Sequence, residues 1–277
     1  MSLIVPSNVR PSFAVGYARS AAESDNPGLW DGLVAAYCPA LGPTGSVLRD
    51  LVGQQDGTLQ NMEAADWQVH DSMGYTLSLG GTDEFVQLPG SFTPSEPRTI
   101  MAWARTTDTT LSRAYCWADN TQTDRMLAVS IRGNNPFAYT VRYDDNSTVS
   151  STRTAVQGQW YCLAGVSRAS NDHELYIDGE LDGSGAGDTT FSTLNDGALG
   201  KETDSGPRYL TGNIGPAYYW ERALSGDELK QLCADPLAPF RRRIHIPLVT
   251  AAAPPVGTGV KHPLAGPFSL PLQGSLG

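Results

Sequence analysis

The residue types that carry most enzyme chemistry are present in this sequence, but they are not spaced for catalysis. Enzymes that hydrolyse polysaccharides often carry an E-x-D-x-E or E-x-D-x-x-E pattern on one strand, which places the catalytic carboxylates on one face of that strand. Neither pattern occurs in this sequence. The G-x-S-x-G, G-x-x-x-x-G-K and H-E-x-x-H motifs are also missing. The histidines are scattered along the chain at His70, His173, His245 and His262. We therefore predict a protein that is not an enzyme.

The charges divide the chain into an acidic body and a basic end. The formal net charge is −10, which disfavours nucleic acid as a partner because phosphates repel an acidic surface. Residues 236–277 contain no Asp or Glu, and their basic residues are Arg241, Arg242, Arg243 and Lys261. We predict that Arg241, Arg242 and Arg243 bind a protein partner, for example a neighbouring copy of the chain. A solvated tail is the alternative.

The remaining bulk features concern compartment and membrane. The apolar run Leu3 to Val5 is too short for a signal peptide, and no eighteen apolar residues follow one another, so neither secretion nor membrane insertion is expected. The four cysteines are widely spaced, without a C-x-x-C pair, and we expect buried free thiols. This expectation favours synthesis in the cytoplasm.

Short apolar runs separated by turn residues predict an all-β chain. Thr99–Arg105 alternates between two faces, and Asp178-Gly179 joins two strand-like runs as a hairpin turn. Ser225 and Glu228 form a capping box that predicts one short helix before Pro236. We expect three parts: an extended N-terminal arm (1–28), a two-sheet antiparallel sandwich (29–235) and a Pro/Gly-rich basic C-terminal arm (236–277).

Seven segments, taken in order, resemble the laminin-G-like, concanavalin-A-like jelly-roll family. They cover roughly residues 29–235 and read LVAAYCP (33–39), RDLVGQQDGTLQNM (49–62), YTLSLGGTDEFVQLPGSF (75–92), TIMAWAR (99–105), QWYCLAGV (159–166), ELYIDGELDGS (174–184) and GNIGPAYYWERALSGDELKQL (212–232). The resemblance implies a jelly-roll sandwich with one short C-terminal helix.

The resemblance also implies a possible calcium site. Family members often hold Ca²⁺ near the Asp/Gly loop, where Asp50 could be a ligand together with carbonyls around Gly53. The chain departs from the family pattern here, because the loop is about one residue shorter and Gly215-Pro216 replaces an acidic pair. The alternative is that Asp50 only braces its own loop. No other cofactor is expected.

The aromatic residues allow two interpretations. Trp103, Trp160 and Trp220 lie in strand patterns and are expected in the core. Trp117, Tyr143 and Tyr209 lie near loops, where they could stack on sugar rings or simply pack.

Three functions are compatible with the sequence, and one of them is enzymatic: a diverged glycan hydrolase or lyase whose pair of carboxylates would come from distant strands. The other two are not enzymatic. The sequence A-D-P-x-x-x-F-R-R-R at 234–243 resembles a tail found in bacteriophage and environmental bacterial proteins. We therefore expect a structural, non-enzymatic accessory protein of a tailed-phage virion, either a capsid decoration protein or a surface adhesin. It would be a homo-oligomer made in the host cytoplasm, its arms would hold capsid or neighbouring subunits, and it could bind host-surface glycans. The alternative is a carbohydrate-binding module of a bacterial surface or secreted system.

Overall fold

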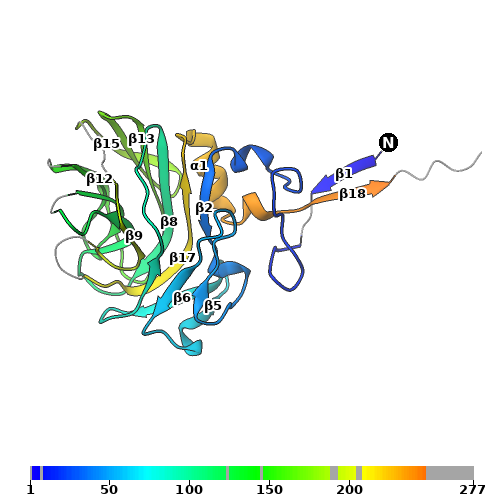
Figure 1. Cartoon of the computed structure of the whole chain (residues 1–277), viewed down its shortest axis with the longest axis horizontal. Coiled ribbons are helices and arrows are strands. Elements are labelled where there is room, and N and C mark those ends of the chain that lie inside the picture. Colours follow the sequence, from blue (N-terminus) through cyan, green and yellow to red (C-terminus); the bar gives the residue numbers. More distant parts are fainter. Residues whose placement is uncertain are drawn as a thin grey trace, which may run out of the picture.

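The computed structural model describes residues 2–6, 9–122, 125–143, 146–187, 193–203 and 208–247. Two antiparallel sheets of eight strands each face one another, which confirms the predicted jelly-roll sandwich (Figure 1). One of them, the β8 sheet, comprises β2 (Leu33–Tyr37), β5 (Trp67–His70), β6 (Gly74–Gly80), β8 (Arg98–Thr106), β13 (Trp160–Ala169), β14 (Asp172–Ile177), β15 (Glu180–Gly185) and β17 (Thr211–Trp220). The other, the β9 sheet, comprises β3 (Val47–Leu48), β4 (Gly57–Gln60), β7 (Phe85–Leu88), β9 (Ser112–Ala118), β10 (Arg125–Ile131), β11 (Pro136–Tyr143), β12 (Asn146–Thr154) and β16 (Asp196–Leu199).

The β8 sheet is buried on both faces. On β8, Ile100, Ala102 and Ala104 point into the core between the sheets, whereas Met101 and Trp103 belong to a second core on the outer face. This arrangement follows from the alternation of side chains along a strand. It explains why β8 is apolar at every position from Ile100 to Ala104.

One helix, α1 (Gly226–Ala234), covers the outer face of the β8 sheet. It begins at the predicted capping box, in which the Ser225 hydroxyl accepts the Glu228 N–H and the Glu228 carboxylate accepts the Ser225 N–H. Leu229 and Leu232 are its buried side chains. No helix in the described part of the chain is long and apolar enough to cross a membrane.

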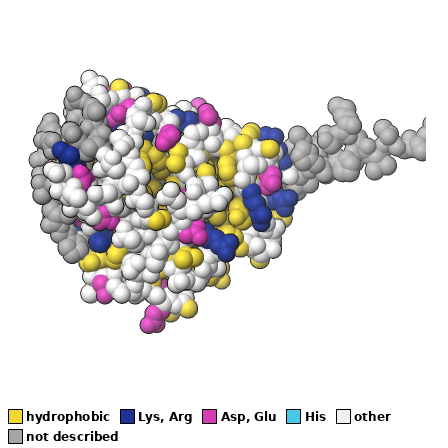
Figure 2. Space-filling view, in the orientation of Figure 1, with side chains coloured by type: hydrophobic (Ala, Val, Ile, Leu, Met, Phe, Trp, Pro, Cys, Tyr) yellow, Lys and Arg dark blue, Asp and Glu magenta, His cyan; other side chains and the backbone are white. Residues whose placement is uncertain are grey.

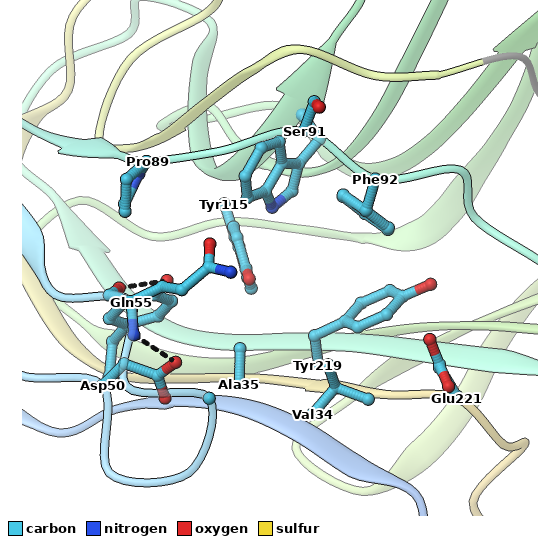
Figure 3. A pocket seen from close by; sticks show the side chains of 13 residues that line it. Val34, Ala35, Asp50, Gln55, Pro89, Ser91, Phe92, Tyr115, Tyr219 and Glu221 are labelled. Carbon is cyan, nitrogen blue, oxygen red and sulfur yellow. Dashed lines mark hydrogen bonds between the residues drawn. The ribbon is translucent and has the colours of Figure 1, made fainter.

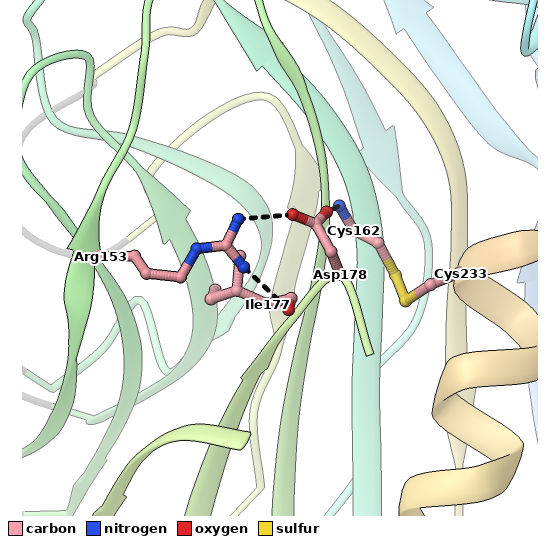
Figure 4. Close-up of a disulfide and its surroundings, with 5 residues drawn as sticks. All are labelled: Arg153, Cys162, Ile177, Asp178 and Cys233. Atoms are coloured by element: carbon pink, nitrogen blue, oxygen red, sulfur yellow. Dashed lines mark hydrogen bonds and ion pairs between the residues drawn. A yellow bond between two sulfur atoms is a disulfide. The ribbon is translucent and has the colours of Figure 1, made fainter. Parts of the chain in front are cut away.

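A disulfide joins Cys162 on β13 to Cys233 in α1, so the prediction of four free thiols was wrong (Figure 4). The two residues are 71 positions apart in sequence, but the helix packs on the sheet and brings their Cα atoms to 5.7 Å. Cys38 and Cys116 are free and buried, as expected. The cytoplasmic compartment was inferred from the expectation that all four thiols are free, and the disulfide removes that basis.

The hairpin β14–β15 approaches α1 closely. Asp178 and Gly179 both have positive φ, at 54° and 82°, as the predicted Asp-Gly turn requires. A Cβ atom on Gly179 would lie 2.8 Å from the Cα of Lys230, so glycine is also needed for the helix to fit.

The terminal segments differ from the extended arms that were predicted. Ala18, Ser24 and Leu29 are buried, and so are Leu237 and Phe240 at the other end of the chain. The chain segments before β2 and after α1 pack on each other through the short helices η1 (Pro27–Trp30) and η4 (Ala238–Phe240). Two further short helices, η2 (Pro39–Leu41) and η3 (Ala64–Asp66), lie within connections. Much of residues 10–28 and 236–242 is therefore part of the body.

The first and the last strands of the described residues form a small sheet of their own. Strand β1 (Ser2–Pro6) pairs antiparallel with β18 (Arg243–Pro247), and this ribbon projects from the sandwich in Figure 1. The basic segment that begins at Arg243 therefore pairs with the chain's own N-terminal strand.

A buried histidine at the end of the sandwich predicts a pH-dependent stability. His173 Nδ1 lies 2.9 Å from Ser167 Oγ, and Nε2 lies 3.0 Å from the Gly187 carbonyl. Burial lowers its pKa below the usual 6.5. Below pH 6.5 the unfolded chain therefore binds a proton that the folded chain does not, and the free energy of unfolding falls by up to about 1.4 kcal/mol per pH unit.

The measurement is urea unfolding between pH 7.5 and 5 for the wild type and His173→Gln. We expect a smaller loss of stability on acidification in the variant. An equal loss in both proteins would contradict the assignment.

Candidate functional site

A pocket opens between the two sheets beside strand β2. Its volume is about 130 Å³. The β8 sheet contributes residues from β2 and β17, and the β9 sheet contributes residues from β9 and from the chain that follows β7 (Figure 3). The lining residues are Val34, Ala35, Tyr37, Asp50, Gly53, Gln55, Pro89, Ser91, Phe92, Tyr115, Trp117, Tyr219 and Glu221.

Aromatic rings form most of the wall, and they contact one another edge to face. The ring centres of Phe92 and Trp117 are 4.9 Å apart, and those of Phe92 and Tyr219 are 5.1 Å apart. Tyr37 and Tyr115 meet at 90°. Such contacts restrict each ring, so the wall is pre-formed.

One polar atom in the pocket has no partner. The Tyr219 hydroxyl is buried, the residue being 3% exposed, and it makes no hydrogen bond to any described group. Burial raises the pKa of Tyr219, so the hydroxyl stays protonated and can donate. In Figure 3 the Tyr219 hydroxyl points toward the side of the pocket where Glu221 lies, and the Gln55 amide points inward. A buried hydroxyl without a partner costs folding free energy, and a bound ligand with an oxygen at this place would remove that cost.

Asp50 lines the pocket, but its carboxylate is hydrogen-bonded within its own loop and to β2. Its Oδ1 accepts the Ala36 and Val52 N–H groups at 2.9 and 3.1 Å, and its Oδ2 accepts the Gln55 N–H at 3.3 Å. Three N–H dipoles directed at the carboxylate occupy the positions that a cation would need. The described residues include no group of three or more His, Cys, Asp or Glu side chains that could hold a metal. The hydrogen bonds of Asp50 are those expected of a residue that braces its own loop, and a calcium ion at Asp50 stays a prediction.

The three arginines predicted to bind a partner lie where the chain leaves the body. Arg241 is ion-paired with Asp235. Arg242 is exposed, and its backbone bridges Ser24, whereas Arg243 begins β18. A partner for them stays a prediction.

Of the aromatic residues considered for sugar stacking, Trp117 lies in the pocket. Tyr209 packs against Phe85, and the Tyr143 side chain falls outside the described residues. Trp103 and Trp220 are buried as predicted, while Trp160 is partly exposed at the edge of a second hollow next to the disulfide. Sequence reasoning missed Tyr219, Phe92 and Gln55, because the sequence alone does not place these distant segments together.

The fold and the pocket between its sheets define the class as a two-sheet, lectin-like β-sandwich. A family model of the concanavalin A-like lectin/glucanases superfamily matches residues 80–230, and the chain belongs to this superfamily. No curated protein matches the chain.

Among solved structures, the chain is similar to a Trypanosoma rangeli sialidase in complex with the inhibitor DANA, with 16% sequence identity and a TM-score of 0.52. The match covers 73% of this chain and only 32% of the sialidase. A second similar structure is domain 4 of AbnA, an extracellular arabinanase of Geobacillus stearothermophilus, in complex with arabinotriose. Here the identity is 19%, the TM-score is 0.51, and the match covers 73% of this chain and 98% of that domain. At these identities the likeness concerns the fold.

Proposed function

We propose that the protein binds carbohydrate without acting on it, through the aromatic pocket between the two sheets. The observation that carries the proposal is the unpartnered Tyr219 hydroxyl in a pocket walled by aromatic rings. Sugars present apolar C–H faces that pack on such rings, and their hydroxyls pair with polar groups such as those of Tyr219 and Gln55. The arabinotriose bound to domain 4 of AbnA is compatible with this ligand class.

The dimensions of the pocket suggest which part of a glycan it takes. A volume of about 130 Å³ has room for about one sugar unit, so the ligand would be a chain end or a side branch. Two carboxylates, Asp50 and Glu221, line the pocket, but Asp50 is occupied by three N–H groups. We therefore propose recognition and no glycosidic cleavage.

The test uses two valines that are exposed on different strands. Val34 lines the pocket at 38% exposure, and Val69 on β5 is 68% exposed and does not line it. We expect binding to at least one family of glycans on an array of oligosaccharides. Val34→Arg should abolish this binding because a long cation fills the pocket entrance, and Val69→Arg should leave it unchanged. Equal binding by both variants would rule out the pocket.

The second candidate function is an accessory role in a bacteriophage virion. The terminal segments would anchor the protein to capsid subunits or to further copies of the chain. The observation that favours its association with another chain is the ribbon β1–β18, which joins neither eight-stranded sheet in the described part of the chain and whose strand edges could pair with a partner. Two-stranded sheets are marginally stable alone. Light scattering on the purified full chain tests this candidate: a defined oligomer is expected, and a monomer at all concentrations would contradict self-association.

A further inference from the structure

A second concave surface lies on the other side of the loop that borders the pocket. Two neighbouring hollows of about 610 and 290 Å³ share Tyr17, Arg19 and Arg49. Asp50 lines both the pocket and the larger hollow, so one loop separates the two places. We name the smaller hollow the arginine groove; it is lined by Phe13, Gly16, Tyr17, Arg19, Pro43, Thr44 and Arg49.

Aromatic rings hold both arginines of the groove. The Arg19 Cζ lies 5.5 Å from the centre of the Tyr17 ring, and the Arg49 Cζ lies 5.6 Å from the centre of the Phe13 ring. The two rings pack edge to face at 5.7 Å, so the four side chains form one cluster. Tyr17 also contacts the buried Phe240, which fixes the cluster on the body. A guanidinium that rests on a ring still presents its N–H edge to a ligand, in a geometry suited to a carboxylate or sulfate.

The lining of the arginine groove carries positive charge, while the nearest carboxylates belong to Asp50 and Asp56 in the larger hollow and to Glu23, which accepts the Arg19 backbone N–H at 3.0 Å. Neither Arg19 nor Arg49 has an ion pair with any residue that the structure describes, and no acidic residue lines the arginine groove. A third guanidinium is close by, since a Cβ on Gly16 would lie 3.2 Å from Arg242 Nη1. Figure 2 shows basic side chains gathered at the end of the body that faces β1 and β18 in Figure 1. In a chain of net charge −10, a groove whose own charged lining residues are arginines attracts an anion.

We propose that the arginine groove binds the negatively charged group of an acidic glycan, either a uronic carboxylate or a sulfate ester. That the ligand is a carbohydrate follows from the proposed function. That it is negatively charged is inferred from Arg19 and Arg49. The aromatic rings beside the guanidinium groups provide an apolar surface for the C–H face of the charged sugar. The protein would then bind two parts of a glycan on either side of one loop: a sugar unit in the pocket and an acidic group in the arginine groove.

The experiment compares ligands that differ only in charge. Titration calorimetry at low salt would use oligogalacturonate, its methyl ester of the same length and a heparin-derived oligosaccharide. The double variant Arg19→Gln/Arg49→Gln removes both charges and keeps most of each stem. Arg132→Gln is the matched control, because Arg132 is exposed and lies outside the groove.

We expect the wild type and Arg132→Gln to bind at least one acidic probe more tightly than the ester. The double variant should bind that probe about tenfold or more weakly, with unchanged binding of the ester. The stronger of the two acidic probes identifies carboxylate or sulfate as the source of the charge. Equal binding of acid and ester by the wild type, or equal binding of the acid by wild type and double variant, would overturn the proposal.

Two further measurements separate this proposal from the proposed function. If Val34→Arg loses neutral glycans but retains charge-dependent binding of the acidic probe, the groove stands as a site of its own. If no neutral glycan binds to the wild type while the acidic probe binds through the arginines, the pocket proposal fails and the groove remains. Poly-glutamate that binds as tightly as oligogalacturonate, and with the same dependence on the arginines, would overturn the assignment to a glycan.

Discussion

Replacing Tyr219 by Phe should weaken glycan binding about tenfold while leaving the fold as stable as before or slightly more stable. The substitution removes only the hydroxyl, and the ring contact with Phe92 is kept. This hydroxyl is buried and has no hydrogen-bond partner among the residues that the structure describes, a state that costs about 1–3 kcal/mol. In the complex it would donate to a sugar oxygen, so its loss should appear in the affinity and not in the stability. Calorimetry and urea unfolding measure the two quantities separately.

Tyr139 provides the matched control for this prediction. It is also buried between the sheets, but its hydroxyl lies 2.8 Å from Ser167 Oγ and is therefore satisfied. Tyr139→Phe should destabilise the protein by about 1 kcal/mol, because the Ser167 hydroxyl loses a partner, and should leave glycan binding unchanged. A Tyr219→Phe variant that is destabilised like Tyr139→Phe, with wild-type affinity for the glycan, would show that the Tyr219 hydroxyl serves the fold.

The sequence specified the architecture well because its signals are local. Alternation over Thr99–Arg105 indicated most of β8, the Asp178-Gly179 turn located the β14–β15 hairpin, and the Ser225 capping box located the start of α1. Strands β3, β5 and β16 were not predicted as separate elements, since each has two to four residues and no alternation long enough to recognise.

The pocket could be predicted only in part. Its wall combines β2, the loop after β3, the chain after β7, β9 and β17, and strand pairing across the sheets brings these segments together. Trp117 was identified because an aromatic residue near a loop is a local signal. The free hydroxyl of Tyr219 depends on what surrounds it in space, which no sequence pattern encodes.

The terminal segments show a second limit. Proline-rich stretches without periodicity were assigned to extended arms, because they could not be expected to form helices or strands. In the structure one proline carbonyl joins the two terminal segments. The Pro239 carbonyl accepts hydrogen bonds from both the Ser24 hydroxyl and the Trp30 indole N–H, each at 2.7 Å. Packing of this kind produces no periodic pattern of apolar residues in the sequence. The virion role, the partner of Arg241 to Arg243 and the localisation stay predictions.

Reduction of the Cys162–Cys233 disulfide should lower the free energy of unfolding more than the Tyr139→Phe substitution does. The bond closes a segment of about 71 residues between β13 and α1, and the loss of chain entropy in the unfolded state predicts a stabilisation of about 2–4 kcal/mol. For a chain of this size the corresponding fall in Tm is roughly 5–15 °C. Thermal unfolding with and without reductant measures it.

A double variant, Cys162→Ser/Cys233→Ser, isolates the effect of the bond from other effects of the reductant. Its Tm should be low and insensitive to reductant, whereas the Tm of the wild type should fall on reduction. The other two thiols, Cys38 and Cys116, are buried, and burial raises the pKa of Cys116 to about 11, so neither should react in the folded protein.

Counting thiols therefore decides whether the bond exists. In denaturant without reductant, two thiols should react, and four should react after reduction. Four reactive thiols before reduction would mean that Cys162 and Cys233 are unbonded in the protein. In that case α1 would be held on the β8 sheet by non-covalent contacts, such as the packing of Leu229 and Leu232, and the Tm of the wild type would not depend on the reductant. Two thiols together with a Tm lowered by reductant would establish that the bond holds the helix over the outer core.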